Sequence, residues 1–219
     1  MVAEARPRAH YGTITVVGGG CYGRYYVRQL QRAAAAGAIG WRCLEVVDRD
    51  PACLVTREST WRDAGPEAPA PHLVVATWRD HFGRAIAEAA PDDAVVPSPL
   101  MPHLMVEWIL DRVRDAWPAR TVGLRALPAP LDVPWQQANG DAPHYASFAT
   151  WTCPVNCIEP AKCPETRGVR DWSLPPTLAA YASRTPGVGG AVIFPCTHRA
   201  SGVGMFEARG VVAADRQVA

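Results

Sequence analysis

Two groups of residues in this chain have the types and spacing that ligand binding requires: a glycine motif with a later aspartate, and a group of cysteines. The glycine motif is Gly18-x-Gly20-x-x-Gly23, and the aspartate is Asp48. In such a motif the first glycine permits a tight turn, the second lets a pyrophosphate approach the backbone, and the third lets a helix pack closely on a sheet. The start of that helix offers N–H groups to phosphates. A carboxylate in the place of Asp48 accepts hydrogen bonds from a ribose 2′-hydroxyl, which favours NAD over NADP.

The cysteine group is Cys153-x3-Cys157-x5-Cys163, in a segment stiffened by prolines. Thiolates concentrated in this way are typical ligands of zinc or of an iron–sulfur cluster. A fourth ligand must come from elsewhere in the chain, and the candidates are Cys196, His198 and His144. The spacing matches no common zinc or iron–sulfur motif, so unmetallated thiols in a rigid loop are the alternative.

The remaining cysteines, Cys21, Cys43 and Cys53, are scattered and do not resemble a site. The remaining histidines are dispersed, and we expect them in packing or at the surface: His10, His72, His81 and His103. No serine–histidine–aspartate set and no carboxylate pair is identifiable, so no catalytic residue is assigned.

The residues around the glycine motif predict a strand–helix–strand unit. Residues 13–17 form a β-branched run that indicates a buried strand. Residues 21–36 place apolar side chains on one helical face, and Gly37 is suited to end that helix. Residues 43–48 supply the next strand and end on the aspartate.

The alternation continues to about residue 117. Strands are expected at residues 73–77 and 94–96, and helices at residues 80–90 and 102–116. Strands alternating with helices predict a mostly parallel sheet with helices on both faces. We therefore predict an α/β fold with a Rossmann-like dinucleotide-binding domain at residues 1–120.

The composition changes beyond that point, where twelve of the 21 prolines lie between residues 118 and 195. We predict a loop-rich region, rich in proline and cysteine, at residues 121–219, which a metal would cross-link. Its expected regular elements are strands at residues 121–125 and 191–194 and a closing helix at residues 204–214.

The motifs VVGGG and LVVAT, with the helix that follows the second, resemble the NAD-binding domains of potassium-uptake regulators and of siroheme-type precorrin-2 dehydrogenases. The resemblance is to the Rossmann-type NAD(P)-binding superfamily and covers about residues 12–117. It implies that the three glycines and Asp48 hold the cofactor. The precorrin-2 enzymes carry a catalytic acidic residue after the last strand, where this chain has PSP at residues 97–99. Their dehydrogenase and chelatase chemistry is therefore not implied.

Charge and hydropathy argue against two classes of partner. Lys and Arg total 22 against 21 Asp and Glu, a formal net charge of +1, so no overall basic field exists to hold nucleic acid. No apolar run approaches the roughly 20 residues that span a bilayer, and the N-terminus lacks the apolar core of a signal peptide. We expect a cytoplasmic protein that binds no membrane.

Two functions follow from these patterns. The first is an NAD-binding oxidoreductase with a cysteine-ligated metal, zinc or iron–sulfur. The second is a non-enzymatic nucleotide or redox sensor, or a regulatory subunit. The expected partners are the nucleotide cofactor and a protein, either another chain or a second copy of this one. S-adenosylmethionine or a flavin is an alternative ligand for the glycine motif, and glycines that serve packing alone are another alternative.

Overall fold

The computed structural model describes residues 9–57, 68–101, 103–138, 140, 143–154, 157–200 and 202–218. The chain forms two compact units. Unit 1 comprises Met1–Leu104 and Cys196–Ala213, and unit 2 comprises Met105–Pro195 and Ala214–Ala219. The division into residues 1–120 and 121–219 stays a prediction, and these units differ from it because residues 196–213 return to unit 1.

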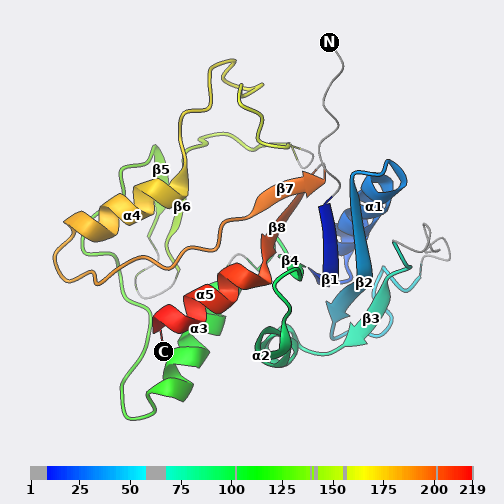
Figure 1. The fold of residues 1–219 in the computed structure, drawn as a ribbon. Helices are drawn as coiled ribbons and strands as arrows, with labels where there is room; N and C mark the ends of the chain where they lie inside the picture. The colour runs from blue at the N-terminus through cyan, green and yellow to red at the C-terminus, as the bar shows by residue number, and fades with distance from the viewer. Residues whose placement is uncertain are drawn as a thin grey trace. The chain divides into compact units, whose positions relative to one another are not determined.

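Unit 1 is built on a six-stranded sheet in the order β3-β2-β1-β4-β8-β7 (Figure 1). The strands are β1 (Ala9–Val17), β2 (Ile39–Asp48), β3 (His72–Val75), β4 (Ala94–Val96), β7 (Thr197–Ala200) and β8 (Val203–Glu207). The first four run parallel, whereas β8 is antiparallel to β4 and β7 is antiparallel to β8. The predicted α/β class with a mostly parallel sheet is therefore confirmed.

Two helices of unit 1 follow strands of this sheet. Helix α1 (Cys21–Ala35) buries Gly23, Val27, Leu30 and Ala34, which share one face at helical spacing. It ends as predicted at Gly37, which has φ of +71° and donates its N–H to the carbonyl of Ala34. Helix α2 (Trp78–Glu88) starts at Thr77, whose hydroxyl oxygen accepts the N–H of Asp80 at 3.2 Å.

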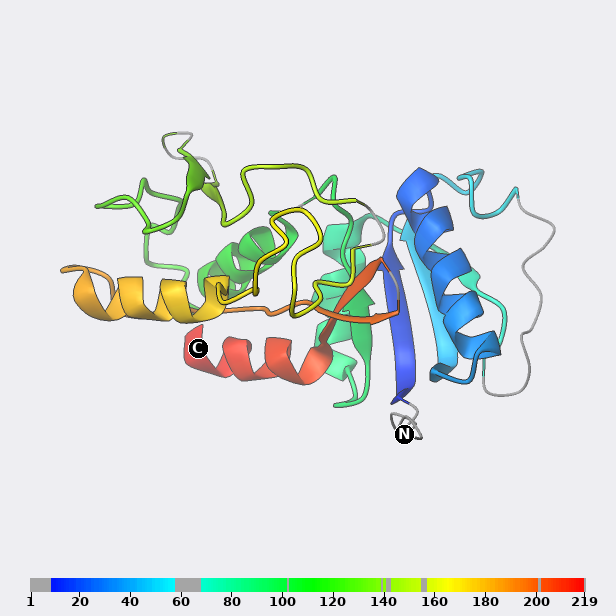
Figure 2. The same cartoon turned by 90° about the horizontal axis from the view of Figure 1, so that it is seen from above.

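The two helices lie on opposite faces of the sheet (Figure 2). On one face Ile14 and Val16 of β1 and Leu44 and Val46 of β2 form a buried core with α1. Because side chains alternate along a strand, Glu45 projects from the other face, where its carboxylate meets a histidine of α2. This second face therefore carries polar groups.

The end of the chain differs from the prediction. The expected helix at residues 204–214 is wrong in its first part, because β8 occupies Val203–Glu207 and α5 (Ala208–Val218) begins only afterwards. Val203 and Met205 join the core under α1, while the ring of Phe206 lies 6.4 Å from that of Phe82 in α2. Both sides of β8 are thus buried, and burial in the sheet overrides local helix propensity.

Unit 2 has less regular structure. It holds α3 (Leu104–Ala116, from its second residue), the hairpin strands β5 (Trp135–Gln137) and β6 (Tyr145–Ser147), α4 (Leu174–Arg184) and the end of α5. The predicted strands at 121–125 and 191–194 are wrong, since those described residues form no strand. Arg112 of α3 donates two hydrogen bonds to Asp215 of α5, at 2.7 and 3.1 Å, and so joins the two helices.

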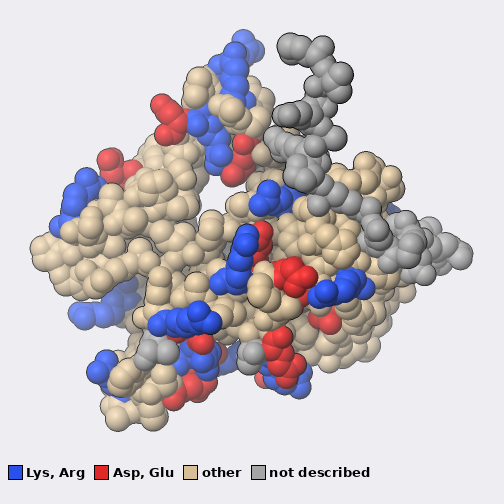
Figure 3. Space-filling model, in the orientation of Figure 1, with Lys and Arg blue, Asp and Glu red and all other residues tan. Residues whose placement is uncertain are grey.

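Charges of both signs are mixed on the molecular face in Figure 3, which matches the formal net charge of +1. Among the described residues, no helix is both long enough and apolar enough to cross a membrane.

Candidate functional site

Strand β1 ends in the glycine turn that the sequence predicts. Gly18 has φ of +85°, and its N–H donates to the carbonyl of Val47 at 2.8 Å, which ties the turn to β2. Gly20 is the N-cap of α1 and is exposed. A Cβ placed on Gly20 would meet no heavy atom within 4 Å, so the space beside this residue is open.

Gly23 packs directly against the turn. A Cβ on Gly23 would lie 1.8 Å from the carbonyl oxygen of Gly18 and 2.9 Å from its carbonyl carbon. Real Cβ atoms essentially never approach backbone so closely. Only glycine fits at position 23, and it brings the first turn of α1 against the end of β1.

The N-terminus of α1 has no side-chain cap. Gly20 has no side chain to provide one, and the first turn contains no acidic residue. The ring of Tyr22 lies 6.3 Å from that of Tyr26, one turn further along the helix. The first N–H groups of α1 and the positive end of its dipole therefore suit an anionic group.

Asp48, the last residue of β2, lies beside the glycine turn. Its Oδ2 accepts the N–H of Gly19 at 2.6 Å, and its Oδ1 accepts the N–H of Asp50 at 2.9 Å. Each carboxylate oxygen keeps a second lone pair, so Asp48 can still accept a hydrogen bond from a ligand. The structure thus brings Asp48 and the three motif glycines together at the carboxyl ends of β1 and β2.

The segment after β2 packs on the same turn. Val55 donates its N–H to the carbonyl of Gly19 at 3.0 Å. A Cβ on Gly19 would lie 2.3 Å from the sulfur of Cys53, which is buried. Cys53 is therefore a packing residue of the glycine turn.

The three loop cysteines lie in unit 2, between β6 and α4. Cys153 is exposed, Cys157 is half-buried and Cys163 is buried. The N–H of Cys163 donates to the carbonyl of Gly168 at 2.9 Å, and its carbonyl accepts the N–H of Arg167 at 2.8 Å. The chain around Cys163 therefore forms a closed turn.

The backbone of this turn stabilises a thiolate. The backbone N–H groups of Thr166 and Glu165 donate to the sulfur and lower the pKa of the Cys163 thiol, and Thr166 has the larger effect. The Thr166 side chain adds a further hydrogen bond in the same direction. Arg167 adopts φ of +57° where the turn closes.

The other two sulfurs also accept hydrogen bonds. Cys157 accepts the N–H of Glu159 at 3.4 Å, and Glu159 has φ of +49°. Burial, followed by the charge of Cys157, raises the pKa of Cys153, while a hydrogen bond from the Trp151 side chain opposes that rise. A group of thiolates that repel one another is stabilised by a cation placed among them.

The candidates for a fourth ligand lie elsewhere. Cys196 and His198 belong to unit 1, at the start of β7. His144 lies beside the β5–β6 hairpin, where its Nε2 is 3.1 Å from Oε1 of Gln136. The identity of the fourth ligand stays a prediction.

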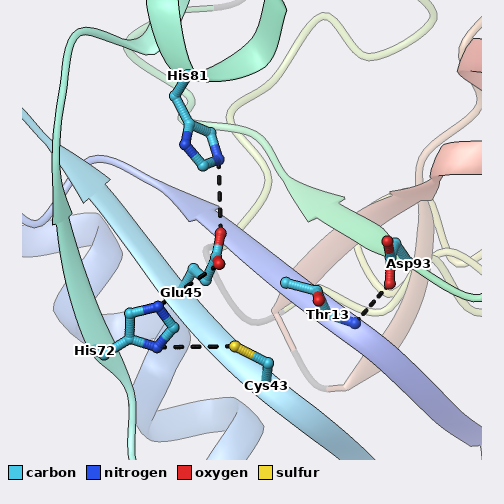
Figure 4. Close-up of polar contacts among 6 residues, drawn as sticks. All are labelled: Thr13, Cys43, Glu45, His72, His81 and Asp93. Carbon is cyan, nitrogen blue, oxygen red and sulfur yellow. Dashed lines mark hydrogen bonds and ion pairs between the residues drawn. The ribbon is translucent and has the colours of Figure 1, made fainter. Parts of the chain in front are cut away.

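Unit 1 contains a group of chemistry-bearing side chains that the sequence analysis missed (Figure 4). Cys43 and Glu45 are two positions apart on β2, so their side chains share a face. His72 is the first residue of β3 and pairs in register with Glu45, and His81 comes from α2. The alternation Cys43-x-Glu45 was visible in the sequence, but the strand register and the helix that complete the group were not.

The two histidines face the carboxylate of Glu45, and Cys43 faces His72. His72 Nε2 is 3.6 Å from Glu45 Oε1, and His81 Nε2 is 3.6 Å from Glu45 Oε2. The sulfur of Cys43 is 3.7 Å from His72 Nδ1. One ligand atom from each of Cys43, Glu45 and His72 lies within 4.8 Å of the others. Among the described residues no other group of three meets that distance, so a metal in the cysteine loop would have to draw its sulfurs together.

Burial affects two members of this group. It raises the pKa of the Cys43 thiol, and the charges of Glu45 and Asp93 add to that rise. Burial lowers the pKa of His81, which therefore favours its neutral form. The Nε2 atom of His81 is buried and has no hydrogen-bond partner in the described part of the chain.

Comparison with known proteins gives one family. Residues 105–219 match the family AF_1314_C, whose description is "Uncharacterized protein, C-terminal domain". No curated protein and no solved structure matches the chain. The matched segment starts at the residue where unit 2 starts, and it includes the loop cysteines and Cys196. Because the match spans more than half of the 219 residues, the chain belongs to the AF_1314_C family.

Proposed function

We propose that this protein is an NAD-binding oxidoreductase: the dinucleotide binds at Gly18, Gly20, Gly23 and Asp48, and the cysteine loop binds a metal. The observation that carries the nucleotide site is the uncapped N-terminus of α1, which starts at the glycine turn beside the carboxylate of Asp48. Glycine turns of this kind place a pyrophosphate on the helix N-terminus.

The order of the parallel strands supports this proposal. The four parallel strands lie in the order β3-β2-β1-β4, which agrees with the first four positions of the Rossmann order 3-2-1-4-5-6, and β1 leads into the glycine turn. In open α/β sheets ligands bind outside the carboxyl ends of the parallel strands. Gly18 and Asp48 both lie at that edge.

Asp48 favours NAD as the dinucleotide. A carboxylate at the end of β2 accepts hydrogen bonds from the ribose hydroxyls of NAD and repels the 2′-phosphate of NADP. Its existing bond to Gly19 holds the carboxylate beside the turn. When bound, NAD supplies hydride transfer, and this chain's own residues bind and orient it.

The hydrogen bonds to the loop sulfurs support a metal in unit 2. Each of the three cysteines accepts at least one N–H, and backbone donors lower the pKa of Cys163. Such donors around ligating groups orient them and are typical of metal sites. Cys153, Cys157 and Cys163 would be three of the ligands, with zinc or an iron–sulfur cluster as the occupant.

The nucleotide site is tested by titrating the purified chain with NADH and NADPH and following cofactor fluorescence. Gly20→Ala is the informative variant, because its Cβ meets no protein atom but would stand where a pyrophosphate approaches. We expect the wild type to bind NADH more tightly than NADPH and Gly20→Ala to lose affinity while remaining folded. Gly83→Ala, on the exposed side of α2, is the matched control and should bind as the wild type does. If Gly20→Ala bound NADH with the affinity of the wild type, the proposed nucleotide site would be wrong.

The metal is tested by elemental analysis and an absorption spectrum of anaerobically purified protein. Iron with visible charge-transfer absorption identifies a cluster, and stoichiometric zinc in colourless protein identifies zinc. Cys153→Ser with Cys157→Ser should remove this metal, whereas Cys21→Ser, at an exposed position on α1, should not. An unchanged metal content in the double variant would show that the cysteine loop does not bind the metal.

The oxidoreductase class is tested by NADH oxidation with a panel of small carbonyl compounds and electron acceptors. Turnover that Gly20→Ala abolishes supports the enzyme. Tight NADH binding without any turnover would instead assign the protein to the nucleotide sensors.

A further inference from the structure

We propose that Cys43, Glu45 and His72 form a second metal site, which binds a divalent transition cation such as zinc, with His81 holding the carboxylate of Glu45. This site lies within unit 1 and is independent of the cysteine loop. Glu45 is three residues before Asp48 on β2, about 10 Å along the strand, so the site is also separate from the glycine turn.

The distances support a cation. Glu45 lies 3.6 Å from each histidine nitrogen, which is longer than the 2.7–3.2 Å of an N–H···O hydrogen bond. The Glu45 carboxylate and the two imidazole rings therefore face one another at ion-pair distances, and the sulfur of Cys43 lies 3.7 Å from Nδ1 of His72 (Figure 4). With zinc–sulfur bonds of about 2.3 Å and zinc–nitrogen bonds of about 2.0 Å, tetrahedral geometry puts ligand atoms about 3.3–3.6 Å apart. One ligand atom from each of Cys43, Glu45 and His72 lies within 4.8 Å of the others, so a small movement of the side chains would bring the three to that spacing.

The ligand types support zinc within this class. Cysteine sulfur, histidine nitrogen and a carboxylate oxygen are the three ligand types that zinc combines, whereas calcium and magnesium take oxygen ligands. Three protein ligands leave a fourth position, as in catalytic rather than structural zinc sites. The His72 side chain is 52% exposed, so this position is accessible to water or a small substrate.

His81 supplies an independent observation. Its Nε2 atom is buried without a hydrogen-bond partner among the described residues, and it faces the oxygen of Glu45 that is farther from His72. An unpaired buried nitrogen costs free energy, which a reoriented, metal-bound carboxylate would offset by accepting its N–H. His81 is therefore a positioning residue for Glu45.

The same three side chains resemble a Cys–His–Glu catalytic triad, but the backbone argues against nucleophilic catalysis. Cys43 lies inside β2 and pairs in register with Thr13 of β1, so it is held in a regular sheet rather than at a turn or a helix N-terminus, where free N–H groups form an oxyanion hole. A nucleophilic cysteine lies in surroundings that favour its thiolate, and burial beside Glu45 does the opposite.

The test uses the full chain carrying Cys153→Ser and Cys157→Ser, so that the loop does not contribute. The probe is Co²⁺, a visible substitute for zinc, with zinc competition to measure affinity. We expect one Co²⁺ per chain with charge-transfer absorption from a single thiolate. Adding His72→Ala or Cys43→Ser should weaken binding by at least about 100-fold. His72→Ala removes a largely exposed side chain, so it tests the site without loss of core packing.

Two further variants complete the test. His81→Gln should weaken binding about 10- to 100-fold while retaining the stoichiometry and the thiolate absorption, because His81 does not contact the cation. Cys21→Ser in the same background should bind as its parent does. Absence of Co²⁺ binding in the loop-deficient chain, or binding unchanged by His72→Ala, would overturn the proposal. The proposed metal site in the cysteine loop is tested by a separate measurement. If that site does not exist, Cys153→Ser with Cys157→Ser will not lose one metal equivalent relative to the wild type.

Discussion

A Cβ on Gly23 would lie 1.8 Å from the carbonyl oxygen of Gly18. This contact joins the first turn of α1 to the end of β1, and Gly18 itself requires φ of +85° to make the turn. The glycines are therefore constrained by packing whether or not a nucleotide binds. Their effects on stability and on binding must be measured separately.

Gly23→Ala should destabilise unit 1 by about 3 kcal/mol. The added methyl group would overlap the Gly18 carbonyl, and the packed backbone would have to shift to make room for it. Urea denaturation of the purified chain measures this loss. Gly83→Ala is the opposite case, since its methyl group meets nothing and alanine favours the helix by about 0.5–1 kcal/mol. Equal stability of the two variants would contradict the close contact.

Asp93→Ala should cost about 1–3 kcal/mol of the free energy of unfolding. Its carboxylate accepts the N–H of Thr13 at 2.7 Å and that of Ala90 at 2.8 Å, and removal leaves both donors unpaired in a partly buried place. Asp92→Ala is the adjacent control. The Asp92 side chain forms an exposed ion pair with Arg42 at 3.4 Å, so its loss should cost at most about 1 kcal/mol. Thermal or urea unfolding compares the two, and a larger effect at Asp92 would contradict this reading.

Tyr11→Phe should reduce the loss of stability at alkaline pH. Burial raises the pKa of Tyr11 above its ordinary value of 10.0, so the unfolded chain loses this proton before the folded chain does. The contribution is complete below pH 10.0 and is lost as the pH rises through the folded pKa. Urea unfolding at about pH 8 and about pH 11 should show a smaller decrease for Tyr11→Phe than for the wild type. Parallel decreases would show that Tyr11 does not contribute.

Removal of the loop metal should loosen residues 151–172 and leave the sheet of unit 1 intact. Hydrogen exchange in that segment should accelerate after treatment with a chelator, because the metal cross-links a segment whose described residues form no helix and no strand. The Cys153→Ser and Cys157→Ser chain should show the fast exchange without chelator. Exchange in β1 and β2 is the internal control, and acceleration there as well would point to general unfolding.

The amino-acid sequence by itself determined the local structure around the glycine motif. The strand ending at Val17, the helix face of Val27 and Leu30, and the stop at Gly37 follow from short-range rules, because each depends on neighbouring residues. The alternation of strands and helices likewise determined the α/β class. Cys163 was recognisable as a ligand candidate from its spacing, but the N–H groups around its sulfur depend on how the loop folds.

Tertiary structure alone decided two other features. Residues 203–207 form β8 because β4 offers them a free sheet edge with apolar groups on both sides, which local periodicity does not reveal. Cys43, Glu45 and His72 meet because β2 and β3 pair in a particular register, and His81 joins them because α2 packs on that face. Long-range pairing places residues far apart in the chain within bonding distance, and no pattern of nearby residues specifies it.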